Sequence, residues 1–431
     1  MNRGEMLRRD LEERLRLALG VRIAVEMVGP GELVPLTGHG TRAKLKRTTR
    51  PSRKGEHMRK LALSLLVLFV ALSLLALGSY PQGVGPAPAE AQVKATVLKG
   101  QASFPPTSLL FTNFKVFADR VEKMSAGRLK IETLPPGAVV GAFEVADATN
   151  RGVLDVAHTC TYYFIGKHKA AALFTDVPGG PFGMDVIDFW GWEYEGGGVE
   201  LLNEFYQKIL NMKIVAFPIF PTTAQSLGWF KKPLKSIADF KGLKYRVPGL
   251  AAEVYKEIGV SVVTLPGGEV LPALERGVLD ATEWYTPGED IQLGFHNVQK
   301  YYYYPGVHET AGACDLLVNK DVWDKLPADL QSIMRGAAFE AAMRSLLQFN
   351  RADAEALRDF KDKHKVNLVK TPDDILIEYL KAWDKIAERE SAKDAFFKRV
   401  YDSQRAYAAL VVPSRVFMNP YDLVRKHYFG K

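Results

Sequence analysis

The chain has 431 residues and a formal net charge of +8 at pH 7, with 57 Lys and Arg against 49 Asp and Glu. The first 60 residues hold 15 Lys and Arg and 7 Asp and Glu, so the rest of the chain carries 42 of each sign and is neutral. The basic character therefore belongs to a leader, and it does not indicate a nucleic-acid-binding protein.

A signal-peptide pattern occurs inside the chain. Met58-Arg59-Lys60 is followed by the apolar run Leu61–Leu77 and then by Ala89-Glu90-Ala91. This order of a basic segment, a hydrophobic segment and an Ala-x-Ala site predicts a signal peptide over residues 58–91, and hence a periplasmic protein. An uncleaved anchor is the alternative, because the apolar run is slightly long. No cysteine lies near the cleavage site, so no lipid anchor is predicted.

Residues 1–57 need a separate explanation, because a signal peptide does not work behind a long polar segment. The stretch Leu7–Arg50, with its Lys-rich end, resembles the C-terminal end of phenylacetate-CoA ligase-type adenylate-forming enzymes. We interpret residues 1–57 as an extraneous segment of a neighbouring reading frame, joined through a wrong start codon, with Met58 as the initiator.

The pentapeptide Arg-Gly-Val-Leu-Asp occurs twice, at Arg151–Asp155 and at Arg276–Asp280. Each copy follows a short amphipathic segment, Phe143–Asn150 or Glu269–Glu275. Glycine ends a helix readily because it adopts the left-handed conformation at little cost, and the apolar pair after it is expected to begin a strand. A helix–glycine–strand unit used twice predicts two similar α/β lobes. A chance repeat of a common junction is the alternative.

Strands and helices alternate along the exported part of the chain, and two long helices follow. This order predicts an α/β fold of two lobes with helices wrapped across or beyond them. The further predicted strands are Ala95–Ala102, Leu129–Leu134, Lys213–Phe220, Leu243–Val247, Val260–Leu265, Tyr301–Tyr304 and Ala313–Val318. The further predicted helices are Ser108–Met124, Phe189–Ile209 with a break at Gly196–Gly198, Ser236–Phe240, Ala251–Ile258, Ala328–Lys363 and Asp373–Ala409.

The two cysteines, Cys160 and Cys314, both lie in apolar, strand-like runs. An exported chain with two cysteines can form one disulfide at most. Buried free thiols are the expectation here. A zinc site is not indicated.

Arg246 ends a predicted strand, and Pro248 and Gly249 stop the strand directly after it. A guanidinium at a strand end that faces a cleft can hold a carboxylate through two parallel charge-assisted hydrogen bonds. A surface arginine, or one that braces the lobes, is the alternative.

Two acidic residues, Glu283 and Glu309, also follow predicted strands, and Gln225 offers a neutral oxygen. Two carboxylates, an amide oxygen and a main-chain carbonyl form an oxygen set that suits a hard cation. Solvated acids are the alternative for each residue taken singly. The sequence contains no HExxH, GxSxG, P-loop or CxxC pattern, so no catalytic site is predicted.

Three runs together resemble the substrate-binding proteins of tripartite ATP-independent periplasmic (TRAP) transporters. They are Gln225 with Gly228-Trp229-Phe230, Gly242–Gly249, and Pro272–Trp284, and the likeness covers roughly residues 93–415. The branch that binds 2-oxo and 2-hydroxy monocarboxylates such as pyruvate and lactate is the nearest. Its further marks are Glu283-Trp284, Tyr301–Gly306 followed by Glu309, and His158-Thr159 with the tyrosines after them.

The resemblance implies a two-lobe periplasmic-binding-protein fold with an interlobe cleft and long C-terminal helices, and no enzymatic activity. It implies that Arg246 clamps the substrate carboxylate, with Tyr162, Tyr163, Gln225 and Trp284 as further substrate contacts. It also implies a sodium or calcium ion bound with the substrate. The implied cation ligands are Gln225, Glu283, Glu309 and the carbonyl of Trp284.

The implied organisation assigns residues 92–220 with about 306–330 to lobe 1 and residues 221–305 with about 331–372 to lobe 2. The C-terminal helix and tail, 373–431, would join a homodimer by helix exchange, and the membrane subunits of a transporter would be the other partners. Residues 1–57 match nothing in the family, and the tail from Tyr407 is longer than expected. An exported α/β enzyme acting on small acids, or a ligand sensor for a signalling partner, are the alternatives.

Overall fold

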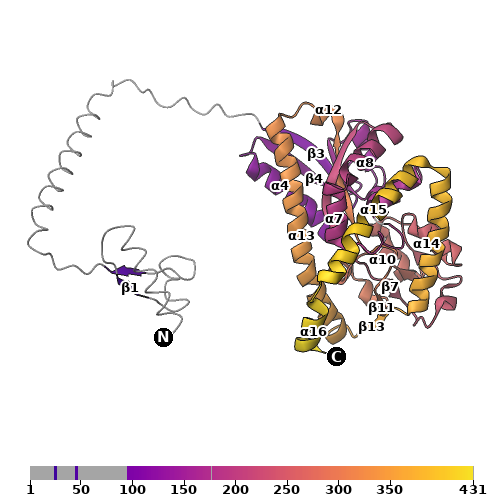
Figure 1. The fold of residues 1–431 in the computed structure, drawn as a ribbon. Coiled ribbons are helices and arrows are strands. Elements are labelled where there is room, and N and C mark those ends of the chain that lie inside the picture. The colour runs from indigo at the N-terminus through magenta and orange to yellow at the C-terminus, as the bar shows by residue number, and fades with distance from the viewer. Residues whose placement is uncertain (1–23, 27–43, 47–94, 176, 431) are drawn as a thin grey trace, which may run out of the picture. The chain divides into compact units, whose positions relative to one another are not determined.

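The computed structural model describes residues 24–26, 44–46, 95–175 and 177–430 (Figure 1). The chain divides into two compact units, Met1–Gln92 and Val93–Lys431. In the first unit, β1 (Ala24–Glu26) pairs with β2 (Lys44–Lys46) in antiparallel fashion. The predicted signal peptide and most of the leader lie outside the described residues.

The second unit contains two sheets, and we call each sheet with its helices a lobe. The sheet of lobe 1 has the strand order β4-β3-β5-β12-β6. Strand β3 runs parallel to β4 and β5, whereas β12 runs antiparallel to β5 and β6. The bounds are β3 Thr96–Ala102, β4 Leu129–Leu134, β5 Val156–Thr159, β6 Ile214–Thr222 and β12 Gly312–Asn319.

The sheet of lobe 2 has the strand order β13-β11-β7-β10-β8-β9. Strand β8 lies between β10 and β9 and is parallel to both, so its carboxyl end lies beside the end of β10. The bounds are β7 Gly228–Phe230, β8 Lys244–Arg246, β9 Ser261–Val263, β10 Ala281–Thr282, β11 Tyr301–Tyr304 and β13 Asn367–Lys370. The two-lobe α/β fold expected from the sequence is confirmed.

Most of the helices cover one lobe each. In lobe 1, a break at Gly196-Gly197 separates α7 from α8, and a π-helical turn over Phe205–Ile209 extends α8. The bounds are α4 Leu109–Met124, α5 Val145–Asn150, α6 Ala172–Thr175, α7 Val186–Glu195, α8 Gly198–Glu204, α9 Ala251–Glu257, α10 Gly267–Glu275, α11 Pro287–Leu293 and α12 Lys320–Trp323. Short 3-10 helices cover Thr161–Phe164, Lys169–Ala171, Ile237–Phe240 and Phe295–Asn297.

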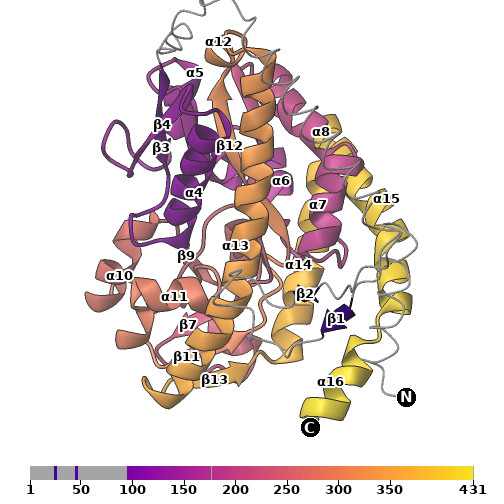
Figure 2. The same cartoon turned by 90° about the vertical axis from the view of Figure 1, so that its left-hand side faces the viewer.

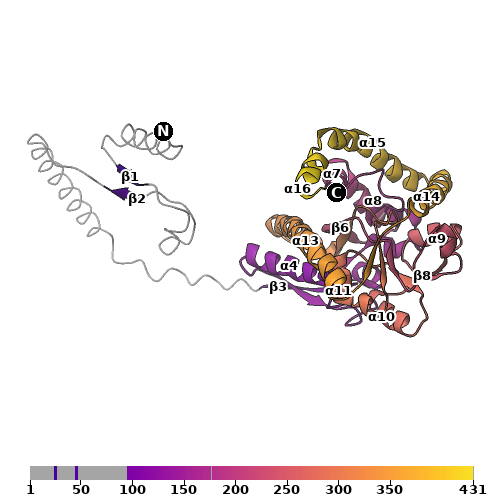
Figure 3. The same cartoon turned by 90° about the horizontal axis from the view of Figure 1, so that it is seen from below.

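One long helix, α13 (Ala328–Asp362), connects the lobes. It packs against α4 and β6 of lobe 1 and against α11 and β13 of lobe 2, and Figure 2 shows it running past both. Figure 3 shows α14 and α15 as an outer layer on the side opposite α10. The described part of the chain contains no helix long and apolar enough to cross a membrane.

The single helix predicted over Asp373–Ala409 is wrong. The structure has α14 (Asp373–Lys393) and α15 (Ala395–Met418), followed by α16 (Tyr421–Phe429). Asp394 breaks the helix because its backbone is extended, and its side chain accepts a 2.6 Å hydrogen bond from the amide of Phe397. Asp is a favourable N-cap residue, so it restarts the helix in a new direction.

The repeated pentapeptide forms the same structure twice. Gly152 and Gly277 both have positive φ, 72° and 70°. Asp155 exchanges two hydrogen bonds with the backbone of Lys99 on β3, and Asp280 does the same with Lys244 on β8. The expectation that the apolar pair begins each strand is wrong, because β5 and β10 start only after the aspartate. The valine of each pair is exposed and the leucine is buried, so the pair joins helix to strand.

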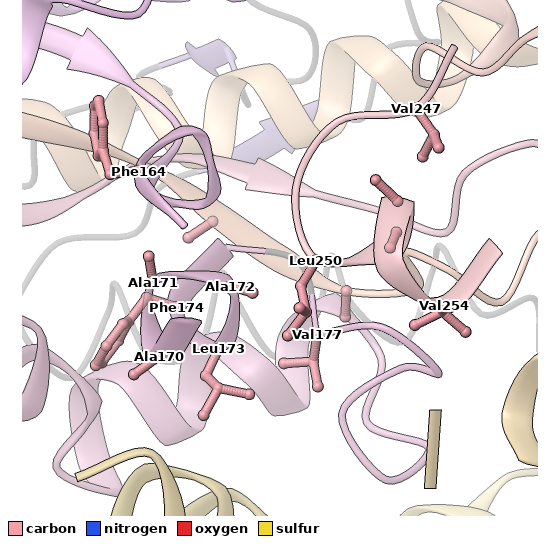
Figure 4. Close-up of a cluster of buried hydrophobic side chains, with 14 of the residues drawn as sticks. Phe164, Ala170, Ala171, Ala172, Leu173, Phe174, Val177, Val247, Leu250 and Val254 are labelled. Atoms are coloured by element: carbon pink, nitrogen blue, oxygen red, sulfur yellow. The ribbon is translucent and has the colours of Figure 1, made fainter. Parts of the chain in front are cut away.

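A buried apolar cluster packs β8 and α9 against lobe 1. Figure 4 shows Val247, Leu250 and Val254 near the segment Phe164–Val177 of lobe 1. The labelled side chains are at most 3% exposed. The cluster therefore packs the segment directly after Arg246 against lobe 1.

The expectation of free thiols is also wrong. Cys160 and Cys314 form a disulfide with a Cα–Cα distance of 4.4 Å. The residues lie next to paired positions of β5 and β12, because Thr159 pairs with Asp315. Antiparallel pairing brings two residues that are 154 positions apart within bonding distance, and sequence spacing alone could not reveal this pairing.

Candidate ligand and cation site

Three loops meet where the two lobes face each other. The segment after β6 carries Gln225, whose amide donates to the carbonyl of Glu309 at 2.9 Å and whose carbonyl accepts from Gly306 at 2.8 Å. The next amide, that of Ser226, donates to the carbonyl of Tyr285 at 3.2 Å. These backbone hydrogen bonds hold the loops after β6, β10 and β11 together.

Arg246 is 1% exposed, and several contacts hold its guanidinium group. Its Nη1 donates to Glu283 Oε1 at 2.5 Å, and its Nε and Nη2 donate to the carbonyl of Leu265 at 3.1 and 3.0 Å. The guanidinium also lies 5.2 Å from the ring centroid of Trp284, within the range of a cation–π contact. Three of its five N–H groups are thus engaged, which leaves one on each terminal nitrogen.

A cluster of buried acidic groups lies beside this arginine. Glu283, His308 and Glu309 each place one potential ligand atom so that these atoms lie within 4.8 Å of one another. Glu283 and His308 are 1% exposed and Glu309 is 6% exposed. His308 is not among the site residues predicted from the sequence, although it directly precedes Glu309 in the same loop. Burial lowers the pKa of His308 to about 3, so the side chain is neutral at pH 7.

A cavity of about 20 Å³ lies between the lobes at this point. This volume is far below the usual range for ligand pockets and corresponds to about one water molecule, so the surrounding side chains lie close together. The Cys160–Cys314 disulfide forms part of its wall. The predicted site residues that line it are Tyr162, Tyr163, Gln225, Arg246, Trp284 and Glu309.

The two tyrosines come from the turn after β5, so lobe 1 supplies one side of the cavity. Their rings are 4.6 Å apart in an edge-to-face arrangement. Burial is the largest influence on Tyr163 and raises its pKa, whereas the charge of Arg246 acts in the opposite sense. Tyr163 is therefore a neutral hydroxyl close to the cationic end of Arg246.

The residues present fit a bound cation. The side-chain oxygen of Gln225 is buried and has no hydrogen-bond partner among the described residues. A buried polar atom is costly unless something coordinates it. Gln225 and Glu309 line the same cavity, and potential ligand oxygens of Glu283 and Glu309 lie within 4.8 Å of each other. Oxygen atoms of this kind are the ligands that a hard cation prefers. Trp284, whose carbonyl is the fourth predicted ligand, lines the same cavity.

Comparison with known proteins also indicates a protein that binds small molecules. Residues 101–394 match the model of the family described as bacterial extracellular solute-binding protein, family 7. A monocarboxylate 2-oxoacid-binding periplasmic protein of Nostoc is 38% identical over 305 residues, which cover 71% of this chain and 82% of that protein.

Two solved structures are similar along nearly their whole length. A TRAP solute-binding protein of Pseudoalteromonas atlantica, with bound sodium and pyruvate, is 32% identical with a TM-score of 0.71, covering 77% of this chain and 99% of that one. A TRAP solute-binding protein of Bordetella bronchiseptica, a dimer with calcium and picolinate in one site, is 27% identical with a TM-score of 0.73, covering 78% and 97%. The chain therefore belongs to family 7 of the bacterial extracellular solute-binding proteins, the receptors of TRAP transporters.

Proposed function

We propose that this receptor captures a small 2-oxo or 2-hydroxy monocarboxylate, of the pyruvate and lactate class, together with sodium or calcium in the interlobe cavity. The observation that carries the proposal is the placement of Arg246 between an acidic pair and a small cavity. The Nostoc relative and the Pseudoalteromonas structure support this ligand class.

Arg246 is suited to bind the carboxylate of the ligand. Its two remaining N–H groups, one on Nη1 and one on Nη2, form the pair that meets a carboxylate end-on. Glu283 and the carbonyl of Leu265 fix the orientation of the guanidinium from the other sides. The ligand would therefore enter a preformed clamp, which lowers the entropic cost of binding.

A cation accounts for the negative charge of the site. Glu283, Glu309 and the bound carboxylate would place three negative charges around one guanidinium in a buried region. A cation that takes oxygen ligands from Gln225, Glu283, Glu309, the Trp284 carbonyl and the substrate would balance them. The cation would then hold the second oxygen-bearing group of the ligand, which favours 2-oxo and 2-hydroxy acids over simple fatty acids.

Calorimetry on the exported form tests this function. The protein is chelated and desalted, and pyruvate, lactate, acetate and succinate are each titrated into sodium-free, calcium-free buffer and again with either ion present. We expect binding of pyruvate or lactate that needs the cation, with acetate at least tenfold weaker. Equal affinity for all four acids, or full affinity without any cation, would refute the proposal.

We also propose that residues 58–91 are removed on export and that the exported receptor dimerises and delivers its ligand to transporter membrane subunits. A run of exposed apolar side chains along α15 and α16 supports a second copy as partner, because monomeric proteins rarely expose such patches. Its members include Leu410, Val416, Phe417, Met418, Tyr421, Leu423, Tyr428 and Phe429. Intact mass and light scattering of the exported protein test the two statements; retention of residue 58 or a monomeric mass would contradict them.

A further inference from the structure

His308 is a buried imidazole that the substrate clamp does not use. Its Nε2 has no hydrogen-bond partner among the described residues, and it lies 4.0 Å from Glu283 Oε2, too far for a hydrogen bond. The ring packs against Gly306, where an added Cβ would lie only 2.7 Å from the imidazole. The imidazole is therefore fixed in orientation, with one nitrogen directed at the acidic cluster.

The two ring nitrogens of His308 face different partners. Nδ1 lies 3.3 Å from the hydroxyl oxygen of Tyr255, within hydrogen-bond distance. Nε2 is directed at Glu283, 4.0 Å from its Oε2. When Nδ1 donates to Tyr255, the lone pair lies on Nε2, as in a metal-ligating histidine whose other ring nitrogen donates to a neighbouring oxygen.

The distances allow this lone pair to reach a cation shared with the carboxylates. Potential ligand atoms of Glu283, His308 and Glu309 lie within 4.8 Å of one another. Two ligands of one metal ion, with bonds of about 2.0–2.6 Å, are separated by no more than about 4–5 Å. A lone pair aimed at two carboxylates would be repelled unless a cation lies between them. An imidazole nitrogen among oxygen donors favours divalent transition ions, since sodium and calcium prefer oxygen alone.

We propose that His308 Nε2 is a direct ligand of the bound cation and shifts the selectivity of the site toward divalent transition ions such as Mn²⁺ and Zn²⁺. This inference rests on the proposed function, which requires a cation at the same place. His308 then acts as a selectivity residue, while Arg246 and the oxygen ligands bind the organic acid.

The test compares metal ions in the absence of any organic acid. Ca²⁺, Mn²⁺ and Zn²⁺ are titrated separately by calorimetry into metal-free protein, wild type and His308→Asn. The asparagine amide can still donate to Tyr255 but has no atom at the position of Nε2. We expect Zn²⁺ and Mn²⁺ to bind the wild type at least tenfold more tightly than Ca²⁺. In His308→Asn, their affinities should fall at least tenfold while that for Ca²⁺ changes less than threefold.

Two further measurements test metal ligation by His308 directly. Pulsed electron paramagnetic resonance of bound Mn²⁺ should show nitrogen coupling in the wild type, a readout that needs no variant, and the coupling should vanish in His308→Asn. His427→Asn removes an exposed histidine and should leave zinc binding unchanged. Equal affinities for the three ions, equal losses in the variant, or no nitrogen coupling would overturn the role of His308. If calcium still supports pyruvate binding in that case, the proposed function stands without it.

Discussion

Glu289 of lobe 2 accepts hydrogen bonds from the N-terminus of α4 in lobe 1, through its Oε1 from Ser108 at 2.6 Å and through its Oε2 from the amide of Leu109 at 2.7 Å. The same carboxylate accepts a 3.1 Å hydrogen bond from Trp284 Nε1, and Trp284 covers Arg246. Ser108 is the N-cap of α4, where the helix dipole favours a negative charge. One buried carboxylate thus joins the ligand cavity to the contact between the lobes.

We expect Glu289→Gln to weaken ligand binding by opening the lobes. The amide nitrogen of glutamine cannot accept from Leu109, so a charge-assisted hydrogen bond across the interface is lost, which costs roughly 1.5–3 kcal/mol. Small-angle scattering should show a more open molecule at saturating ligand, and calorimetry a correspondingly higher dissociation constant. Asp239→Asn neutralises an exposed carboxylate inside lobe 2, whose Oδ2 accepts from the amides of Lys235 and Ser236, and serves as control, with ligand affinity unchanged. Wild-type affinity and shape in Glu289→Gln would exclude this coupling.

Arg246→Ala should reduce the affinity for the organic acid by roughly 2–5 kcal/mol, as expected when one partner of a buried charge pair is removed. Arg246→Lys should restore only part of it, because an ammonium cannot form the two parallel hydrogen bonds. The measurement is calorimetry at a fixed cation concentration. Arg351→Ala, on the exposed face of α13, is the matched control. Affinity of the alanine variant equal to that of the wild type would remove Arg246 from the ligand site.

Glu283→Gln should weaken cation and acid binding together. If the two ligands share the site, each raises the affinity of the other by the same factor, because binding free energies are linked. Titrating the acid over a series of calcium concentrations, and calcium over a series of acid concentrations, measures both factors. Glu355→Gln, an exposed acid, provides the control. An acid affinity independent of calcium, or a loss in Glu283→Gln confined to one of the two ligands, would contradict a shared site.

The sequence allowed the prediction of the fold from local patterns, and of most of the cavity residues from the resemblance to the receptors of TRAP transporters. Strand-end positions of Arg246 and Glu283 were visible from the apolar runs before them and the turn residues after them. The structure then placed Gln225, Arg246, Trp284 and Glu309 around one cavity. Their binding roles stay predictions.

Features that depend on contacts between distant segments could not be predicted. The disulfide needs the pairing of β5 with β12, and the role of Glu289 needs the packing of lobe 2 on α4. His308 has no local mark, since its environment is made by Tyr255 of α9 and by Glu283 of the loop after β10. The break at Asp394 was not predicted for a different reason. The helical sequence pattern continues through this residue, and only the N-cap hydrogen bond of Asp394 separates the two helices.

Removing the disulfide should lower stability and disturb the cavity. Its 154-residue separation corresponds to at most roughly 5 kcal/mol of loop-closure entropy in the unfolded state. The double variant Cys160→Ala, Cys314→Ala should therefore unfold at a lower temperature in calorimetry. Because both residues line the cavity, acid affinity should fall as well. If the double variant unfolds at the same temperature as the wild type, both with and without reductant, the bond does not form in the folded protein.

Stability should fall as the pH is lowered from about 6.5 toward 4, partly because of His158. This side chain is fully buried in lobe 1, and burial lowers its pKa from 6.5 to about 4 although backbone hydrogen bonds from the ring oppose the shift. The unfolded state therefore binds more protons over this interval, so the free energy of unfolding increases with pH. A shift of this size corresponds to about 3 kcal/mol. Urea titrations at several pH values should show a shallower dependence in His158→Asn, which can still donate to the carbonyl of Asp315. The exposed His427→Asn should retain the wild-type dependence, and an equal slope in His158→Asn would mean that other groups control the acid transition.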